Sequence, residues 1–185
     1  KLIHMSTDCV FSGKKKSPYL ETDERDGNDT YAKTKALGEI ISENHLTIRT
    51  SVVGPETIDG LEEGLFHWFM NQNDEIFGYK KSLWSGVTTL ELAKAIKWSI
   101  ENEVYGLRNL TSSIPISKYH LLKIINDKTK KDLKITQTDG PAHNKALIDS
   151  YEFFYKTEVN YEKIIQEMID DIVSRKSDYP HYEIS

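Results

Sequence analysis

Cysteine is almost absent from this sequence, which contains Cys9 and no other. A single thiol cannot form an internal disulfide or a zinc site built from several cysteines. The six histidines offer no substitute, because no two of them stand at the H-x-x-x-H spacing that puts two imidazoles on one helix face. We therefore expect no metal site, and the cysteine content favours a reducing cytoplasm as the location.

The sequence also lacks a long apolar run and a surplus of basic residues. No stretch approaches the length of a membrane span or of a signal-peptide core, so we expect no membrane association. The 29 acidic residues outnumber the 24 lysines and arginines, and a formal charge of −5 disfavours nucleic acid as a partner. The 185 residues suffice for one folded domain, or for one domain and a small lobe.

Two glycine-containing motifs are missing as well. Without a G-x-S-x-G elbow, a serine hydrolase of that type is excluded. Without a G-x-G-x-x-G turn, this chain has no glycine-rich cradle for a dinucleotide pyrophosphate. The nearest cluster, Gly54, Gly60 and Gly64, has the wrong spacing, and the acidic residues around it would repel a phosphate.

The most informative stretch that is present covers residues 29–39, DTYAKTKALGE. It predicts a helix that Asp29 or Thr30 caps and that runs to about Glu43. On such a helix Tyr31 and Lys35 are four residues apart and share one face. A neighbouring ammonium favours phenolate and lowers the pKa of tyrosine from its reference of about 10, so the phenol becomes able to exchange protons near neutral pH.

A mostly apolar strand over residues 2–6 precedes this helix and ends in hydroxyl and carboxylate groups. The carboxyl end of a strand is where an open α/β sheet places its chemistry. Thr7 is therefore a candidate to donate a hydrogen bond to the same substrate oxygen that Tyr31 protonates. Together with Lys35, these residues point to carbonyl reduction or alcohol oxidation.

Four motifs in this order resemble the dTDP-4-dehydrorhamnose reductase-like branch of the extended short-chain dehydrogenase/reductase superfamily, which acts on nucleotide sugars. They are STDCVFSG at 6–13, YLETD at 19–23, YAKTKALGE at 31–39 and RTSVVG at 49–54. The resemblance implies an α/β fold: the C-terminal part of a Rossmann-like domain, with a doubly wound parallel sheet, and a small α+β substrate lobe. It also implies NAD(P)H as cofactor and a nucleotide sugar as substrate.

The same resemblance assigns roles to individual residues. It makes Thr7 the hydroxyl partner, Tyr31 the acid/base, and Lys35 both a modulator of the tyrosine and a ligand of the nicotinamide ribose. On the cofactor side it adds Ser51 and Val52. On the substrate side it implies contacts from Asp8, Val10, Phe11, Trp84, Asn144 and Lys145.

The missing glycine-rich turn is a departure from that family. Because the chain also begins abruptly at Lys1-Leu2-Ile3, we expect it to be the C-terminal part of a longer protein, without the half that grips the cofactor and inactive alone. A sheet edge over residues 2–5 would then be exposed, and exposed edges are sticky, so we expect self-association or a homo-oligomer.

Hydrophobic periodicity places the remaining elements. We assign residues 1–112 to the Rossmann-like domain, with a substrate-loop insertion around 56–90, and residues 113–185 to the rest of the substrate lobe and a C-terminal helix. The pattern predicts strands at 46–54, 105–111 and 132–138, the last an edge strand, and helices at 61–70, 90–102, 118–126 and 161–175. We expect the tail from Asp178 to fray.

Reduction of a 4-keto nucleotide sugar, in the synthesis of cell-surface polysaccharide sugars, is the function that this sequence favours. Epimerase or dehydratase chemistry stays an alternative, although Cys9 follows Asp8 where dehydratases of the superfamily carry a glutamate. A non-catalytic binding or regulatory subunit is a third reading. The sugar, the direction of the reaction and the choice between NADH and NADPH are left open by the sequence.

Overall fold

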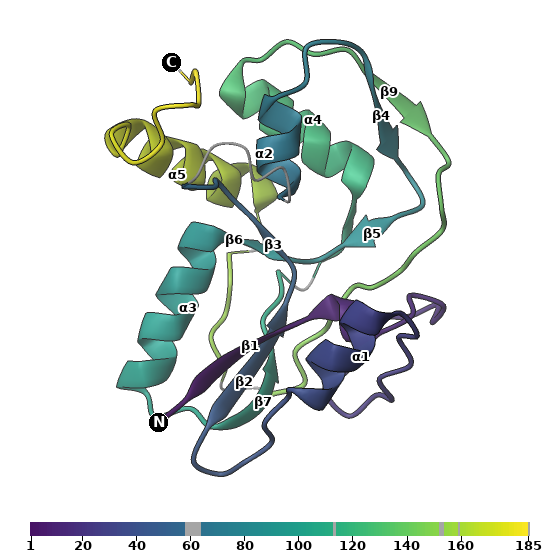
Figure 1. Cartoon of the computed structure of the whole chain (residues 1–185), viewed down its shortest axis with the longest axis vertical. Coiled ribbons are helices and arrows are strands. Elements are labelled where there is room, and N and C mark those ends of the chain that lie inside the picture. The colour runs from purple at the N-terminus through teal and green to yellow at the C-terminus, as the bar shows by residue number, and fades with distance from the viewer. Residues whose placement is uncertain (58–63, 113, 152–153, 159, 185) are drawn as a thin grey trace.

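The computed structural model describes residues 1–57, 64–112, 114–151, 154–158 and 160–184. Figure 1 shows two halves, one above the other. The lower half holds a three-stranded sheet between two helices, built from β1 (Ile3–Thr7), β2 (Leu46–Thr50), β7 (Gly106–Asn109), α1 (Thr30–Leu37) and α3 (Thr89–Glu101). The upper half contains α2 (Leu65–Met70), α4 (Lys118–Thr129), α5 (Tyr161–Ser174), β4 (Ile76–Tyr79) and β9 (Ile135–Thr138). Short elements connect the halves: η1 (Asp8–Val10), β3 (Val52–Val53), β5 (Leu83–Trp84), β6 (Val87–Thr88) and β8 (Ile116–Ser117).

The lower sheet has the order β1-β2-β7, and both pairings are parallel. Central strand β2 is buried throughout, and its side chains alternate between the two faces of the sheet. Leu46 and Ile48 join the apolar cluster that packs against α3. Thr47 and Arg49 point the other way and bond Ile40 and Glu39, just after α1. The helices therefore cover opposite faces, as in a doubly wound α/β fold, which confirms the predicted fold class.

Helix α1 begins where the sequence predicts, because the Asp29 carboxylate accepts the Ala32 backbone N–H at 2.7 Å. The expectation that it runs to Glu43 is wrong, since the helix ends at Leu37. Gly38 follows and disfavours continuation, and the Glu39 side chain is drawn to Arg49 in β2. The residues of interest, Tyr31 and Lys35, both lie within the helix.

The predicted strand at 46–54 is interrupted at Ser51, so one continuous strand was wrong. Its first part is β2, in the lower sheet, whereas β3 pairs with β6 in a separate two-stranded sheet. The carbonyl of Ser51 accepts the Val87 N–H at 2.9 Å, which diverts the chain from one half to the other. Ser51 thus lies at the junction, beside the carboxyl ends of β1 and β2.

The upper half is built on the apolar stripe of α5. Ile164, Ile165, Met168 and Ile169 are buried there among side chains from α2 and α4. In the same half β4 and β9 pair in parallel, and β9 has no other strand partner among the described residues. This agrees with the predicted edge strand.

The end of the chain contradicts the sequence expectation. Tyr179, Tyr182 and Ile184 are buried in the upper core, so the prediction of a frayed tail was wrong. The Tyr182 hydroxyl lies 2.9 Å from His67 Nδ1 and accepts the Glu56 backbone N–H at 2.9 Å. Aromatic side chains with a polar tip fix this segment, because they bury a large apolar area while the hydroxyl finds partners.

Two expectations about the upper half are not decided by these observations. Residues 61–63 of the predicted helix at 61–70 lie outside the described part of the chain, and the rest matches α2. The upper core combines residues 53–84 with residues 121–184, and a domain boundary at 112 stays a prediction.

Among the described residues, no helix has both the length and the apolar character needed to cross a membrane.

Candidate active site

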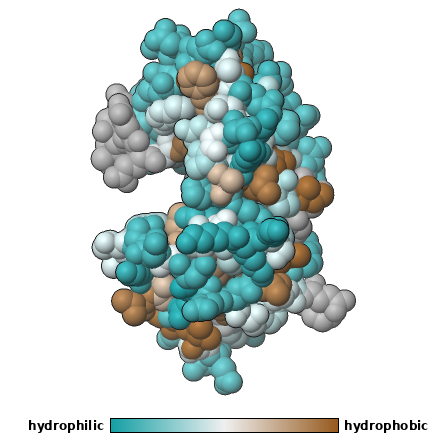
Figure 2. Space-filling model, turned by 90° about the vertical axis from the view of Figure 1, so that its right-hand side faces the viewer, coloured by the Kyte–Doolittle hydropathy of each residue, from teal (hydrophilic) through white to brown (hydrophobic). Residues whose placement is uncertain are grey.

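A cavity of about 440 Å³ lies between the two halves, at the carboxyl ends of β1 and β2. Figure 2 shows that the surface is hollowed between the upper and the lower half. One wall carries Asp8, Phe11 and the residues just before α1, and Ser51 and Trp84 also line the space. The end of β4, the start of α4 and the loop at 141–145 complete the lining. This is the position at which open α/β sheets bind ligands.

The end of β1 presents a carboxyl group to the cavity and not a hydroxyl. Thr7 Oγ1 accepts the Cys9 backbone N–H at 3.1 Å and donates its proton to Asp8 Oδ1 at 3.2 Å. Thr7 is buried and does not line the cavity, whereas Asp8 does. The Thr7 hydroxyl therefore caps η1 and orients the Asp8 carboxyl.

Electrostatics at this wall favour protonated groups. Desolvation raises the pKa of the Asp8 carboxyl above its ordinary value, and this outweighs the opposing effect of the Lys145 and Lys118 charges. Desolvation also raises the pKa of the Cys9 thiol, and the nearby Asp8 raises it further. The cavity thus holds a carboxyl group that keeps its proton to a higher pH than an exposed aspartate, next to a neutral thiol.

The end of β2 contributes Ser51, whose hydroxyl oxygen accepts the Trp84 indole N–H at 2.9 Å. Trp84 borders the cavity but is only 4% exposed, and its ring packs on Tyr161 with centroids 5.5 Å apart. Its faces are consequently committed to the upper core. Trp84 contributes an edge to the site, not a stacking platform.

Two lysines bring positive charge to the cavity. Lys118 and Lys145 line the cavity together with His143, and Tyr79 extends from the end of β4. Sequence reasoning missed Lys118, His143 and Tyr79. A signal for Lys118 existed: it directly follows the cap residue Ser117, and a cation in the first turn of a helix is disfavoured by the helix dipole. A residue placed against that preference is a candidate for binding an anion.

The pair that the sequence singled out lies next to the cavity, on α1. Lys35 is half-buried, and its ammonium donates to the Met5 carbonyl of β1 at 2.7 Å. Tyr31 is 55% exposed. Neither lines the cavity itself, but Asn28 and Asp29, immediately before the helix, do.

The other predicted residues fall into two groups. The cavity brings together Asp8, Phe11, Ser51, Trp84 and Lys145. It does not include Thr7, Val10, Tyr31, Lys35, Val52 or Asn144. Val10 is fully buried beside Phe11, and the Asn144 amide donates to the Lys16 carbonyl at 3.3 Å. The assigned roles of all these residues stay predictions.

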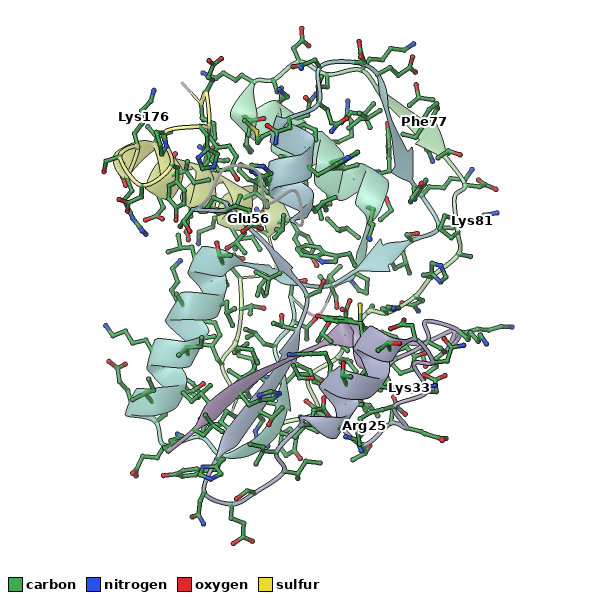
Figure 3. The ribbon with its side chains drawn as sticks, viewed as in Figure 1. Arg25, Lys33, Glu56, Phe77, Lys81 and Lys176 are labelled. Atoms are coloured by element: carbon green, nitrogen blue, oxygen red, sulfur yellow. The ribbon has the colours of Figure 1, made fainter. Side chains whose placement is uncertain are left out.

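A second cavity, of about 420 Å³, adjoins the first through Tyr79 and Lys118, which line both. Its walls include Trp68 and Phe77, which are 36% and 60% exposed. Figure 3 marks Phe77 on β4 and Lys81 just past the end of that strand. The two cavities together join a polar compartment to an aromatic one.

Comparison with known proteins gives the same picture of the fold. The chain is similar to a dTDP-4-dehydrorhamnose reductase from Clostridium acetobutylicum, with a TM-score of 0.71 and 23% identity, over 92% of this chain and 65% of that one. It is also similar to the reductase of that name from Bacillus anthracis, with a TM-score of 0.73 and 18% identity, over 92% of this chain and 66% of that one. The chain thus spans just under two thirds of the length of both structures.

The sequence itself matches known proteins over a shorter stretch. It is 44% identical over 55 residues to the spore coat polysaccharide biosynthesis protein SpsK of Bacillus subtilis, which is 28% of this chain and 19% of SpsK. The model of the RmlD substrate-binding domain family matches residues 1–132. Because that match covers most of the chain and includes all four motifs, it confirms the resemblance that they suggested. The chain belongs to the RmlD substrate-binding domain family.

Proposed function

We propose that this chain is the catalytic and substrate-binding part of a cytoplasmic, NAD(P)H-dependent reductase of a 4-keto nucleotide sugar, in the synthesis of polysaccharide sugars. The observation that carries the proposal is the cavity at the ends of β1 and β2, which a carboxyl, a hydroxyl and two lysines line together. Family membership supports it, as do the names of the relatives, one a polysaccharide biosynthesis protein and two dTDP-4-dehydrorhamnose reductases.

The two compartments suit the parts of a nucleotide sugar. Lys118 and Lys145 supply positive charge for the diphosphate. Asp8 and Ser51 supply polar groups for the sugar. The exposed rings of Phe77 and Trp68 offer faces for the base, because a base has a π face that stacks on aromatic side chains. In this arrangement the sugar lies nearest α1.

The residues on α1 fit the nicotinamide-ribose end of the cofactor. Lys35 uses one of its three ammonium protons on Met5 and has the others for ribose hydroxyls. The pyrophosphate end has no glycine-rich cradle among these 185 residues. In the proposal the rest of the cofactor is held by residues outside this chain, so the chain alone does not turn over. The Bacillus anthracis relative was solved in complex with NADP.

When bound, the nicotinamide supplies a hydride to the keto carbon of the sugar. As that bond forms, the electrons of the carbonyl move onto oxygen, and the Tyr31 phenol gives its proton to that oxygen. The product is an alcohol. Lys35 lies one turn further along α1, and the exposure of Tyr31 lets water return the proton.

The test uses the protein from the complete reading frame and, beside it, this 185-residue chain. Each is titrated with NADH and NADPH, and absorbance at the nicotinamide band is followed after a panel of 4-keto nucleotide sugars is added. We expect the complete protein to oxidise the reduced nicotinamide when one of the sugars is added. We expect the 185-residue chain alone to oxidise none. Cofactor binding without oxidation by any sugar would contradict the reductase and favour an epimerase or a regulatory subunit.

A further inference from the structure

The Ser51 hydroxyl differs from the hydroxyl of Thr7 at the neighbouring strand end. An indole N–H only donates, so the Ser51 oxygen is the acceptor in its bond to Trp84. Within the described part of the chain, the Ser51 hydroxyl donates its proton to no other group. Since Ser51 lines the cavity, that proton is available to a ligand.

The contrast with the neighbouring strand is direct. Thr7 and Thr50 are in register in the parallel sheet, so Asp8 and Ser51 occupy the next corresponding positions on adjacent strands. On β1 the Thr7 proton is already used on Asp8. Of these hydroxyls, the one free to donate into the cavity therefore belongs to Ser51 and not to Thr7, which the sequence favoured.

The surroundings of Ser51 hold its backbone in place, and the bond from Trp84 orients its hydroxyl. Its carbonyl accepts the Val87 N–H at 2.9 Å and the Thr50 hydroxyl at 3.3 Å. Gly86 packs so closely that a Cβ there would lie 2.0 Å from the Ser51 carbonyl oxygen and 2.6 Å from the Trp84 ring. Trp84, in turn, is fixed in the upper core. A donor that is oriented before the ligand arrives loses little freedom on binding.

We propose that the Ser51 hydroxyl donates a hydrogen bond to an oxygen of the sugar, in place of the cofactor contact that the resemblance implied, and that Trp84 acts as a positioning residue through Ser51. The inference rests on the proposed function, and it identifies the hydroxyl group that recognises the sugar. The nucleoside diphosphate, which the proposed function assigns to Lys118 and Lys145, does not depend on this contact.

The test measures two affinities by calorimetry, with the protein from the complete reading frame. One ligand is a dTDP-4-keto-6-deoxyhexose, and the other is dTDP, which lacks the sugar. Ser51→Ala should weaken the sugar nucleotide about three- to tenfold, the range for one neutral hydrogen bond, and leave dTDP unchanged. Trp84→Phe should have the same selective effect, because it keeps an aromatic ring and removes the N–H. Trp98→Phe, in the lower core, is the matched control and should change neither affinity.

The double variant separates a positioning role from a packing role. If Trp84 acts through Ser51, adding Trp84→Phe to Ser51→Ala causes no further loss of sugar-nucleotide affinity. A further loss would overturn the role of Trp84, and a wild-type affinity in Ser51→Ala would overturn the role of Ser51. In both cases the proposed function would stand. Failure of the wild-type protein to bind either ligand would overturn the proposed function and this inference with it.

Discussion

The carboxylate of Glu39 and the guanidinium of Arg49 form a two-pronged ion pair that is shielded from solvent. Arg49 Nε lies 2.6 Å from one carboxylate oxygen and Nη2 lies 2.7 Å from the other, while the two side chains are 0% and 2% exposed. Ser6 and Arg25 donate to the same carboxylate. The pair thereby fastens the segment after α1 to β1, β2 and the preceding loop.

Glu39→Gln should destabilise the protein by about 3–5 kcal/mol, because it leaves the buried Arg49 charge without a partner. Urea unfolding measures the change. The double variant Glu39→Met/Arg49→Met is the control and should recover much of the loss, since it removes both charges and keeps similar volume. A single substitution that costs under about 1 kcal/mol would mean that the pair is not closed in solution.

The pH dependence of Asp139 follows from its contacts with Lys80 and Lys81, whose hydrogen bonds lower the pKa of this carboxyl from 3.8 to about 2. When folding lowers the pKa of a carboxyl group, the group stabilises the folded state at pH values above its unfolded pKa. That stabilisation is lost as the pH falls through the folded pKa. We therefore expect these contacts to persist to pH 3.8 and to be lost as the pH approaches 2. Carbon NMR of the Asp139 carboxyl measures the midpoint. In Lys80→Ala/Lys81→Ala it should return towards 3.8, and an unchanged midpoint would contradict the assignment.

Tyr182→Phe should lower the free energy of unfolding by about 1–3 kcal/mol, because the buried His67 ring and the Glu56 N–H each lose a partner. Thermal unfolding measures the effect. Tyr179→Phe is the matched control in the same segment. Its hydroxyl bonds no group in the described part of the chain, so that variant should unfold at nearly the wild-type temperature. Equal melting temperatures for all three proteins would indicate that the tail is detached.

Tyr31→Phe should reduce turnover of the complete protein about 10²- to 10⁴-fold, the usual contribution of a general acid. The nicotinamide assay measures it, and cofactor binding should persist. Tyr151→Phe serves as the control, since Tyr151 is exposed and lies outside the cavity. If the Tyr31 variant keeps wild-type turnover, the phenol is not the acid.

The 185-residue chain should self-associate through the edge of β1. Among the described strands β1 pairs with β2 alone, and Leu2 beside it is 47% exposed. Light scattering should give a mass that rises with concentration. Leu2→Lys should reduce that rise, because a lysine at an edge opposes pairing. A monomer at all concentrations would disprove the expectation.

Local patterns predicted most of the fold. The C-terminal helix and the cap Asp29 follow from patterns of neighbouring residues, and the structure places them as expected. The predictions were wrong where a contact with a residue distant in the sequence determines the local structure. The contact of Glu39 with Arg49 helps to end α1. The contact of Tyr182 with His67 orders a tail that the sequence alone predicts to fray.

The candidate site shows the same division. The motifs pointed to both Asp8 and Ser51 as site residues, and the two do share the cavity. Spacing could not reveal that Thr7 gives its proton to Asp8, because that depends on the turn into η1. Nor could spacing show that Lys118, more than a hundred residues after Asp8, lines the same cavity. Hydroxyl orientation and long-range contact need three-dimensional coordinates.

The burial of Trp84 gives the site an optical signal of its own. Of the three tryptophans, Trp84 alone borders the cavity between the halves and is nearly shielded from water, whereas Trp68 is partly exposed and Trp98 lies in the lower core. With Trp68 and Trp98 replaced by phenylalanine, emission would come from an indole in an apolar setting, and its N–H bond reports on Ser51. Ligand binding would then change the wavelength and the intensity of the Trp84 fluorescence, so no added dye would be needed.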